Sequence, residues 1–465
     1  MGFGEPCVRM LLEFWRPVPD SRFWSLSSVF NTSHQIDIMI NMLNAKSLDR
    51  PESDSTIQPQ IGEERRRWHN LVLISLATVL SLTVWFSTNA IAPVLEVERG
   101  YTGRDIAWLT IAVQLGFVLG TLLIAFTNLA DLMNTRTLFA ISAVLAGVSN
   151  VALSFVPGGI LTSLVLRVLC GMFLGGVYPP GMKIVSGWFR SGRGIAIGTM
   201  VAALTLGSGS PHLLKSVFIA EWEVTLYISS ILAAVAGAIV YFLVQDGPFD
   251  VPASRFNPRY FLSTIRARST RMVLFGYLGH QWELYAMWSS IPIFLAAVFG
   301  SKSLIGGSLE LAGLITFTVF ISGAAASVAA GVIAERIGRT ATTSIMMALS
   351  GASALFIGFL PMELGFLITI VALVWGASVI ADSAQFSTAL TELSEDAYRG
   401  TALTFQTGIG FLVTIPPIWL TPVVADDWGW GPAFAILGMG PIFGITAMLK
   451  LRAMPESLAC AMGRR

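Results

Sequence analysis

From Asn70 onward, the sequence is a succession of long apolar stretches separated by short polar breaks. A helix needs about 20 predominantly apolar residues to cross the hydrocarbon core of a bilayer. Stretches of that length recur along the rest of the chain, so we predict an all-α membrane protein with twelve transmembrane helices. The predicted helices cover residues 70–93, 105–127, 137–156, 160–183, 194–216, 225–245, 272–297, 308–333, 341–360, 364–388, 401–423 and 430–451.

Composition agrees with this prediction and narrows the function. Hydrophobic residues make up 54% of the chain and charged residues 12%, with a mean hydropathy of +0.70, whereas about 25% of the residues of a soluble domain are charged. The net charge of +1 leaves no basic face for a nucleic acid. The 3 cysteines are too scattered for a disulfide framework or a metal motif. We expect no nucleic-acid partner, no metal and no cofactor.

The basic residues predict the orientation of the chain, because cytoplasmic loops are rich in arginine and lysine. Arg65, Arg66 and Arg67 precede the first predicted helix, and Lys450 and Arg452 follow the last. Most loop arginines fall on the same side. Both termini are therefore predicted to be cytoplasmic, which requires an even number of helices. We expect a multi-pass protein of a plasma or inner membrane that is monomeric in the lipid bilayer.

The polar run before the first helix differs in composition from the rest. We predict a mostly disordered cytoplasmic extension over residues 1–69, with Met39 and Met42 as alternative starts of the native protein. An N-terminal six-helix half, a cytoplasmic linker, a C-terminal six-helix half and a cytoplasmic tail follow, over residues 70–245, 246–271, 272–452 and 453–465.

An internal repeat supports the division into two halves. The segment "AGVSNVALSFVP" at 146–157 aligns with "SGASALFIGFLP" at 350–361, and Asp131 meets Glu335 at the same offset. With a slip of two residues, an Arg-Gly pair at 193–194 meets another at 399–400. Parallel repeats of this kind place a transport site between the halves, near the middle of the membrane.

Two loops and one helix carry motifs that resemble those of the major facilitator superfamily. The first loop motif, "NLADLMNTRTLF", keeps an acid and a base but has asparagines at two positions where glycine is usual, and the second loop motif, "GVIAERIGR", is the better copy. The fourth predicted helix contains "RVLCGMFLGG", and the connection to the fifth helix is also similar. The residues that carry the resemblance are Asp131 and Arg136; Glu335, Arg336 and Arg339; and Arg167, Gly171 and Gly175.

The resemblance covers residues 70–452 and implies a secondary transporter in which two six-helix halves rock around a central cavity. It gives the two loop motifs a gating role, in which a carboxylate near a helix N-terminus pairs with a loop arginine. The alternative is that the loop arginines only set the topology. Gly171 and Gly175, one turn apart, predict close helix packing. Gly207, Gly209 and Pro211 predict a kinked, closely packed fifth helix, but not the antiport motif found in that helix of other members.

Arg167 lies about seven residues inside its predicted span, or roughly 10 Å at 1.5 Å per residue. An arginine at the centre of a membrane helix costs about 2.5–3.5 kcal/mol on insertion scales. A residue that is this costly to bury indicates a functional role for Arg167. We predict that Arg167 faces the cavity and handles substrate or protons, with a buried structural ion pair as the alternative.

The seventh predicted helix carries His280 and Glu283, and Glu283 falls near the middle of the membrane. Their spacing of three places both on one helix face. Three interpretations remain open. The pair carries a proton, the pair binds a polar solute between aromatic side chains, or the two residues form a structural network with each other and with Arg167 or Asp382.

In the superfamily, helices one, four, seven and ten line the cavity, and polar and aromatic residues of this chain concentrate in those helices. The resemblance therefore implies substrate-binding or proton-coupling roles for a set of residues in addition to Arg167, His280 and Glu283. They are Trp85 and Asn89 in helix one, Trp288 in helix seven, and Trp375, Asp382 and Gln385 in helix ten.

The sequence contains no catalytic motif that would make the protein an enzyme. "HQWE" lacks the second histidine of a zinc protease motif, and neither a nucleophile elbow nor a phosphate-binding loop is present. We predict H⁺-coupled transport, by symport, of a small polar molecule. One alternative is a porter of nitrate, nitrite or a small organic anion, since some stretches resemble the nitrate/nitrite-cyanate-type branch, although its glycine-rich signature is missing. Another is a sensor that binds its ligand without moving it.

Overall fold

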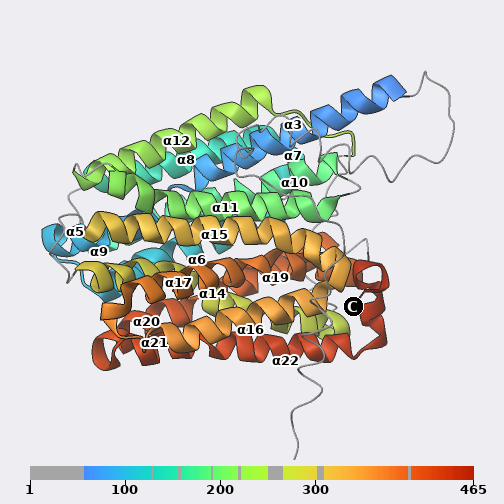
Figure 1. The fold of residues 1–465 in the computed structure, drawn as a ribbon. Coiled ribbons are helices and arrows are strands. Elements are labelled where there is room, and N and C mark those ends of the chain that lie inside the picture. The colour runs from blue at the N-terminus through green and yellow to red at the C-terminus, as the bar shows by residue number, and fades with distance from the viewer. Residues whose placement is uncertain are drawn as a thin grey trace, which may run out of the picture. The chain divides into compact units, whose positions relative to one another are not determined.

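The computed structural model describes residues 57–127, 129–155, 159–189, 192–217, 221–249, 265–300, 308–395 and 399–464, and in these ranges the regular elements are helices (Figure 1). Most of the predicted N-terminal extension and of the linker lies outside the described residues. The chain divides into a unit Met1–Gly62 and a compact unit Glu63–Arg465.

The helices fall into two sets in chain order. The N-terminal set consists of α3 (Ile57–Leu82), α4 (Ser87–Ala90), α5 (Ala92–Arg99), α6 (Gly103–Thr127), α7 (Leu129–Leu132), α8 (Thr135–Phe155), α9 (Ile160–Leu174), α10 (Tyr178–Trp188), α11 (Arg193–Val217) and α12 (Trp222–Leu243). The C-terminal set consists of α14 (Arg268–Gly300), α15 (Ser308–Ile337), α16 (Arg339–Ile357), η2 (Met362–Leu364), α17 (Gly365–Ala381), α18 (Ser383–Leu393), α19 (Arg399–Val413), α20 (Ile415–Trp428), α21 (Trp430–Leu437), α22 (Met439–Arg452) and η4 (Pro455–Gly463).

Within the described ranges, 11 helices or joined helix pairs are long and apolar enough to cross a membrane. They correspond to the second to twelfth predicted spans. The first predicted span, 70–93, is not one helix: α3 begins at Ile57, runs through the charged segment that starts at Glu63 and ends at Leu82, and a turn and the short helices α4 and α5 follow. Large apolar side chains such as Leu161, Phe242 and Phe366 are exposed, as expected for surfaces that contact lipid.

Several spans are interrupted near the middle. The turn at 175–177 separates α9 from α10, and Asp382 separates α17 from α18. These two breaks lie at equivalent positions of the internal repeat. The sequence does not predict the second break, because α17 contains neither proline nor a polar run before it ends.

The internal repeat is also visible in the packing. A Cβ atom on Gly147 of α8 would meet the carbonyl oxygen of Ser230 of α12 at 2.8 Å, and one on Gly351 of α16 would meet Pro441 of α22 at 2.9 Å. Ser149 and Ser353, two residues further along, both donate to the carbonyl oxygen four residues earlier. The third and ninth predicted spans thus pack closely on the sixth and twelfth through matching glycines of the repeat.

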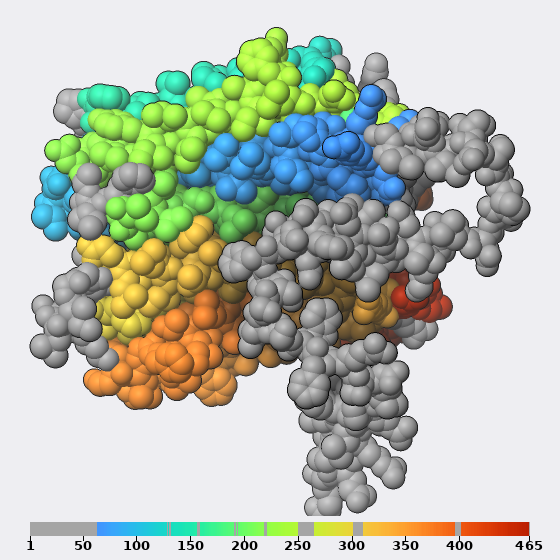
Figure 2. All heavy atoms as spheres, turned by 45° about the horizontal axis from the view of Figure 1, so that its top comes forward, coloured from blue at the N-terminus to red at the C-terminus, as the bar shows by residue number. Residues whose placement is uncertain are grey.

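The two sets meet along α11 and α15, which lie side by side (Figure 1). The contact is built from small residues: a Cβ atom on Gly194 or Gly198 of α11 would meet Glu335 or Ser327 of α15 at 2.7 or 3.2 Å. Figure 2 shows the green surface of the N-terminal set bordering the yellow surface of the C-terminal set. Apart from Glu335, these contacts involve backbone atoms and small side chains, so the two helices approach closely.

Close packing also joins α6 to α9. A Cβ atom on Gly171 would lie 2.0 Å from the carbonyl oxygen of Val113, and one on Gly175 would lie 2.8 Å from the backbone nitrogen of Thr121. A backbone atom cannot move aside as the end of a flexible side chain can. The two glycines of the fourth predicted helix therefore let α9 lie directly against α6.

This packing predicts that Gly171→Ala lowers the melting temperature of the purified protein, since overpacking a well-packed site costs about 1–3 kcal/mol. Gly408→Ala is the matched control, because a Cβ atom there would meet no atom within 4 Å, and alanine is the better helix former. Thermal unfolding in detergent measures both. Equal melting temperatures for the Gly171→Ala variant and the wild type would contradict the close contact of α6 and α9.

Candidate functional site

Glu283 of α14 lies inside the C-terminal set with its carboxylate fully enclosed. Its side chain is only 1% exposed. Oε1 accepts a hydrogen bond of 2.7 Å from the Trp375 indole of α17, and Oε2 accepts one of 2.8 Å from the Ser350 hydroxyl of α16. The two donors are neutral, so the carboxylate is held by hydrogen bonds without a cationic partner at these atoms.

His280 makes a separate contact one turn earlier on α14. Its Nδ1 lies 2.8 Å from Oδ1 of Asp382, and both residues are 1% exposed. Asp382 occupies the break between α17 and α18. The His280 Nε2 atom has no hydrogen-bond partner among the described residues.

Of the three interpretations of His280 and Glu283, the structural network contains the contact of His280 with Asp382 but no hydrogen bond between His280 and Glu283 themselves. The proton-carrying and solute-binding interpretations stay predictions. The helical spacing does place both on the side of α14 that faces the set, but His280 contacts Asp382 while Glu283 contacts Trp375 and Ser350. Sequence spacing predicts which face of a helix a side chain lies on. It does not predict which residue of a neighbouring helix that side chain contacts. Of the predicted partners, only Asp382 is found beside His280.

Arg167 of α9 is completely buried in the N-terminal set. Nη1 donates to the Val84 carbonyl oxygen and to the Ser87 hydroxyl, each at 3.2 Å, and Nη2 donates to Oδ1 of Asn150 at 2.6 Å. In the part of the chain that the structure describes, no carboxylate binds this guanidinium. The alternative of a buried ion pair thus finds no acidic partner there: neutral oxygens accept from Nη1 and Nη2, and Nε has no partner among the described residues.

Asn150 of α8 completes this network. Its amide nitrogen donates to the Leu226 carbonyl oxygen at 3.2 Å and to the Ser230 hydroxyl at 3.0 Å, both in α12. Its amide oxygen accepts from Arg167 and, at 2.7 Å, from Ser87. The sequence analysis missed Asn150, although a lone amide in the middle of a predicted span was a signal that could have identified it.

An aromatic cluster occupies the space between the two sets. The Trp85 ring lies 5.1 Å from Phe117, 5.9 Å from Tyr285 and 5.8 Å from Phe411. These four residues come from α3–α4, α6, α14 and α19, so the cluster joins helices of both sets. Trp288 extends it, with ring contacts to Phe86 at 6.1 Å and to Phe320 at 4.9 Å.

The remaining predicted site residues belong to different surroundings. Asn89 is buried and accepts a hydrogen bond of 3.0 Å from Thr110. The Trp375 indole donates its hydrogen bond to Glu283. Gln385 makes no hydrogen bond to Glu283 among the described residues. Its side-chain oxygen accepts a hydrogen bond of 2.9 Å from Arg339 of the second loop motif.

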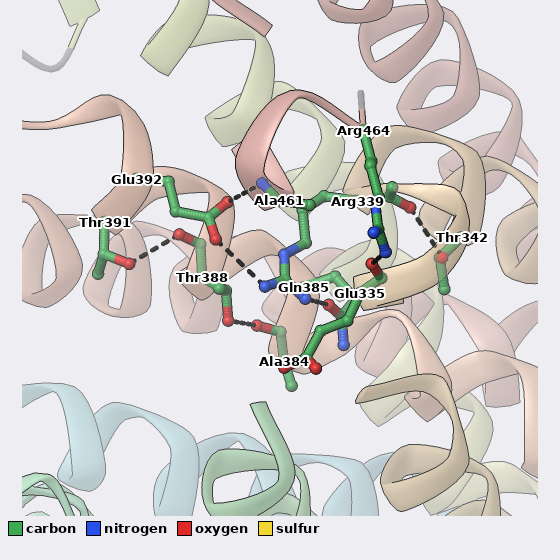
Figure 3. Close-up of polar contacts among 11 residues, drawn as sticks. Glu335, Arg339, Thr342, Ala384, Gln385, Thr388, Thr391, Glu392, Ala461 and Arg464 are labelled. Carbon is green, nitrogen blue, oxygen red and sulfur yellow. Dashed lines mark hydrogen bonds and ion pairs between the residues drawn. The ribbon is translucent and has the colours of Figure 1, made fainter. Parts of the chain in front are cut away.

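The second loop motif forms a polar cluster with α18 and the chain end (Figure 3). Arg339 pairs with Glu392 at 3.1 Å in addition to Gln385. The Glu335 backbone oxygen accepts from Arg464 at 2.6 Å, and the Glu335 side chain faces Gly194 of the N-terminal set. Arg336 is exposed. Arg339 is thus held inside the C-terminal set, while Glu335 is the member of the motif that reaches the other set.

The first loop motif is held inside the N-terminal set. Arg136 pairs with Asp246 at 2.9 Å and donates to the Val244 carbonyl oxygen at 2.9 Å. The Asp131 side chain is outside the described residues. The sequence analysis missed both acids that bind the motif arginines, Asp246 and Glu392, because each lies far from its arginine in the sequence.

The fifth predicted helix, α11, runs unbroken through Pro211. A Cβ atom on Gly207 would meet the Val79 carbonyl oxygen at 2.6 Å, and one on Gly209 would meet the Phe320 ring at 2.5 Å. The two glycines thus bring α11 close to α3 on one side and to α15 of the C-terminal set on the other.

The end of the chain packs against the second loop motif. In η4, the Ala461 backbone nitrogen donates to Oε2 of Glu392 at 3.1 Å, and Cys460 is buried. Burial raises the pKa of the Cys460 thiol to about 12; the neighbouring Glu392 carboxylate adds to the rise, and Arg339 opposes it. Glu392 therefore links Arg339 to the terminal segment.

The long apolar helices define a multi-pass membrane protein, and its interior encloses the ionisable side chains of the site. A family profile described as Major Facilitator Superfamily matches residues 74–302. The chain belongs to this superfamily. No curated protein matches the chain.

The terminal contact predicts that Glu392→Ala exposes Cys460. Without the carboxylate, the Ala461 backbone nitrogen loses its acceptor, and the terminal segment is expected to detach. In a Cys7→Ser background, the rate of maleimide labelling of Cys460 at neutral pH should rise about tenfold or more, as the thiol returns toward its ordinary pKa in water. Glu395→Ala, an exposed neighbour, is the control. An unchanged labelling rate in the Glu392→Ala variant would contradict the contact.

Proposed function

We propose that the protein is a secondary active transporter that moves a small polar solute by alternating access and couples it to H⁺, by symport. The observation that carries the coupling is the environment of Glu283. The Glu283 carboxyl group is buried in the bundle. The geometry of Ser350 allows it to keep its hydrogen bonds both when it is ionised and when it is protonated.

The Ser350 hydroxyl lies within hydrogen-bonding distance of two acceptors. Its hydroxyl lies 2.8 Å from Oε2 of Glu283 and 3.2 Å from the Met347 carbonyl oxygen. When Glu283 is ionised, Ser350 donates to the carboxylate. When Glu283 is protonated, its O–H donates to Ser350, whose hydroxyl hydrogen then turns to Met347. Trp375 donates to the other oxygen throughout. A proton can therefore be gained or lost without leaving a buried polar group unpaired.

The conformational step is a rocking motion of one helix set against the other, and the positions of the buried ionic groups permit it. Arg167 is bound within the N-terminal set, and His280, Asp382 and Glu283 are bound within the C-terminal set. A rocking motion between the sets leaves these hydrogen bonds intact. It changes the contacts of α11 with α15 and those of the aromatic cluster, which are mostly apolar. The proposal keeps both termini in the cytoplasm, on the arginine-rich side, and a monomeric transporter.

A second candidate is a porter of nitrate, nitrite or a small organic anion. Arg167 favours it, because no carboxylate among the described residues binds this buried cation. An anion that displaced the Ser87 hydroxyl would find a guanidinium already fixed in place. In this case too, the solute crosses between the two sets.

The proton-coupled function predicts the behaviour of Glu283→Gln. An amide cannot release a proton, so a pH gradient imposed across proteoliposomes should no longer drive accumulation, while exchange of solute without a gradient continues. A panel of labelled solutes, with a pH-sensitive dye to follow H⁺, measures both.

Glu98→Gln is the matched control, since Glu98 also accepts from an indole, that of Trp222 at 2.6 Å, but is exposed. It should keep its gradient-driven uptake. If Glu283→Gln shows the same gradient-driven uptake as the wild type, the assignment of Glu283 is wrong.

A further inference from the structure

The terminal segment, residues 455–464, folds back against the end of the bundle where the second loop motif lies (Figure 3). Its last residues contact two different elements of the C-terminal set. The Ala461 backbone nitrogen donates to Oε2 of Glu392 in α18 at 3.1 Å, and the Arg464 guanidinium donates to the Glu335 backbone oxygen in α15 at 2.6 Å. The terminal segment therefore connects the ends of α15 and α18.

Both of these elements also contact the N-terminal set, through α11. At the end of α15, a Cβ atom on Gly331 would lie 3.0 Å from the Gly194 carbonyl oxygen of α11, and a Cβ atom on Gly194 would lie 2.7 Å from Oε1 of Glu335. The helix α18 packs against α11 as well. The terminal segment thus holds the two elements of the C-terminal set that meet α11 at this end of the bundle.

The terminal segment itself is held by little apolar contact. Its buried residues are Ser457, Cys460 and Ala461, whose side chains are small. The larger side chains of Leu458 and Met462 are 47% and 90% exposed. A segment with few buried apolar contacts opens at a low cost in free energy, so this one can detach while the helices stay folded.

The backbone is strained where the tip of the segment is attached. Ala461 and Met462 have φ angles of 47° and 55°, in the left-handed region that costs free energy for a residue with a Cβ atom. Further back, the Ser457 hydroxyl donates to the Met454 carbonyl oxygen at 2.7 Å, so the base of the segment is bonded to the chain just after α22. Detachment of the tip releases the strain while the base stays in place.

We propose that the terminal segment is an autoinhibitory strap. While its tip is docked on Glu392 and Glu335, α15 and α18 stay against α11 and this end of the bundle is closed. The tip must detach before the end can open, and its strained backbone keeps the docked and detached states close in free energy. The strap acts on the alternating-access step of the proposed function and rests on it.

Distances between spin labels at Leu132 and Arg336 in the full-length protein measure the opening of this end. Labels attached through a ketone-bearing amino acid leave the native cysteines in place. Arg464→Ala removes the bond to α15 and should raise the ratio of long to short distances in proteoliposomes about threefold or more. Lys450→Ala, which removes an exposed basic side chain of α22, is the matched control and should leave the ratio unchanged.

Two substitutions of Met462 should act in opposite directions. Its side chain is 90% exposed, so either change acts chiefly through the backbone. Glycine adopts a positive φ without the Cβ penalty, and Met462→Gly should lower the ratio of long to short distances about threefold. A β-branched residue adopts a positive φ least readily, so Met462→Val should raise the ratio.

The strap is refuted if none of the three variants changes the ratio of distances, or if the two Met462 variants shift it in the same direction. In either case the proposed transport function stands, as long as the wild type shows both a short and a long distance. One fixed distance in the wild type and in every variant would instead contradict alternating access, and the strap with it.

Discussion

The hydrogen bonds of the buried ionic groups Arg167 and Glu283 stay within one helix set each, and the rest of the structure depends on this constraint. An ionised group in an apolar bundle costs several kcal/mol unless it is well bonded. Arg167 is bonded by Ser87 and Asn150, and Glu283 by Trp375 and Ser350. Because neither network crosses to the other set, each can stay intact while the sets move. Small residues on α11 and α15 and an aromatic cluster are left to form the interface.

The loop motifs extend the same division to the ends of the helices. Arg136 is tied to Asp246 and Arg339 to Glu392, each inside its own set. In this conformation, neither arginine latches the two sets together, as a simple acid–base gate would require. Among the loop-motif residues described here, the Glu335 side chain is the one that faces the other set, at Gly194. The terminal segment, bound to Glu392 and to the Glu335 backbone, is attached to the motif that makes this contact.

The sequence predicts most of the fold because hydropathy and loop charge are local signals. Eleven of the twelve predicted spans and the superfamily are confirmed; the first span differs because its helix ends early, at Leu82. Side-chain partners could not be predicted in the same way. His280 and Glu283 share a helix face, yet they meet residues of different helices.

Alternating access by two internally rigid sets is most directly tested by pulsed spin-label distances in proteoliposomes. Exposed positions at the two membrane ends are Val97 with Trp428 and Leu132 with Arg336, each pair joining the two sets. We predict that each of the two pairs shows a short and a long distance. When the fraction of molecules with the long distance rises at one membrane end, it should fall at the other end. The pair Val97 with Leu161, inside the N-terminal set, should keep a single distance. A change within that set, or a single fixed distance between the sets under all gradients, would contradict the account.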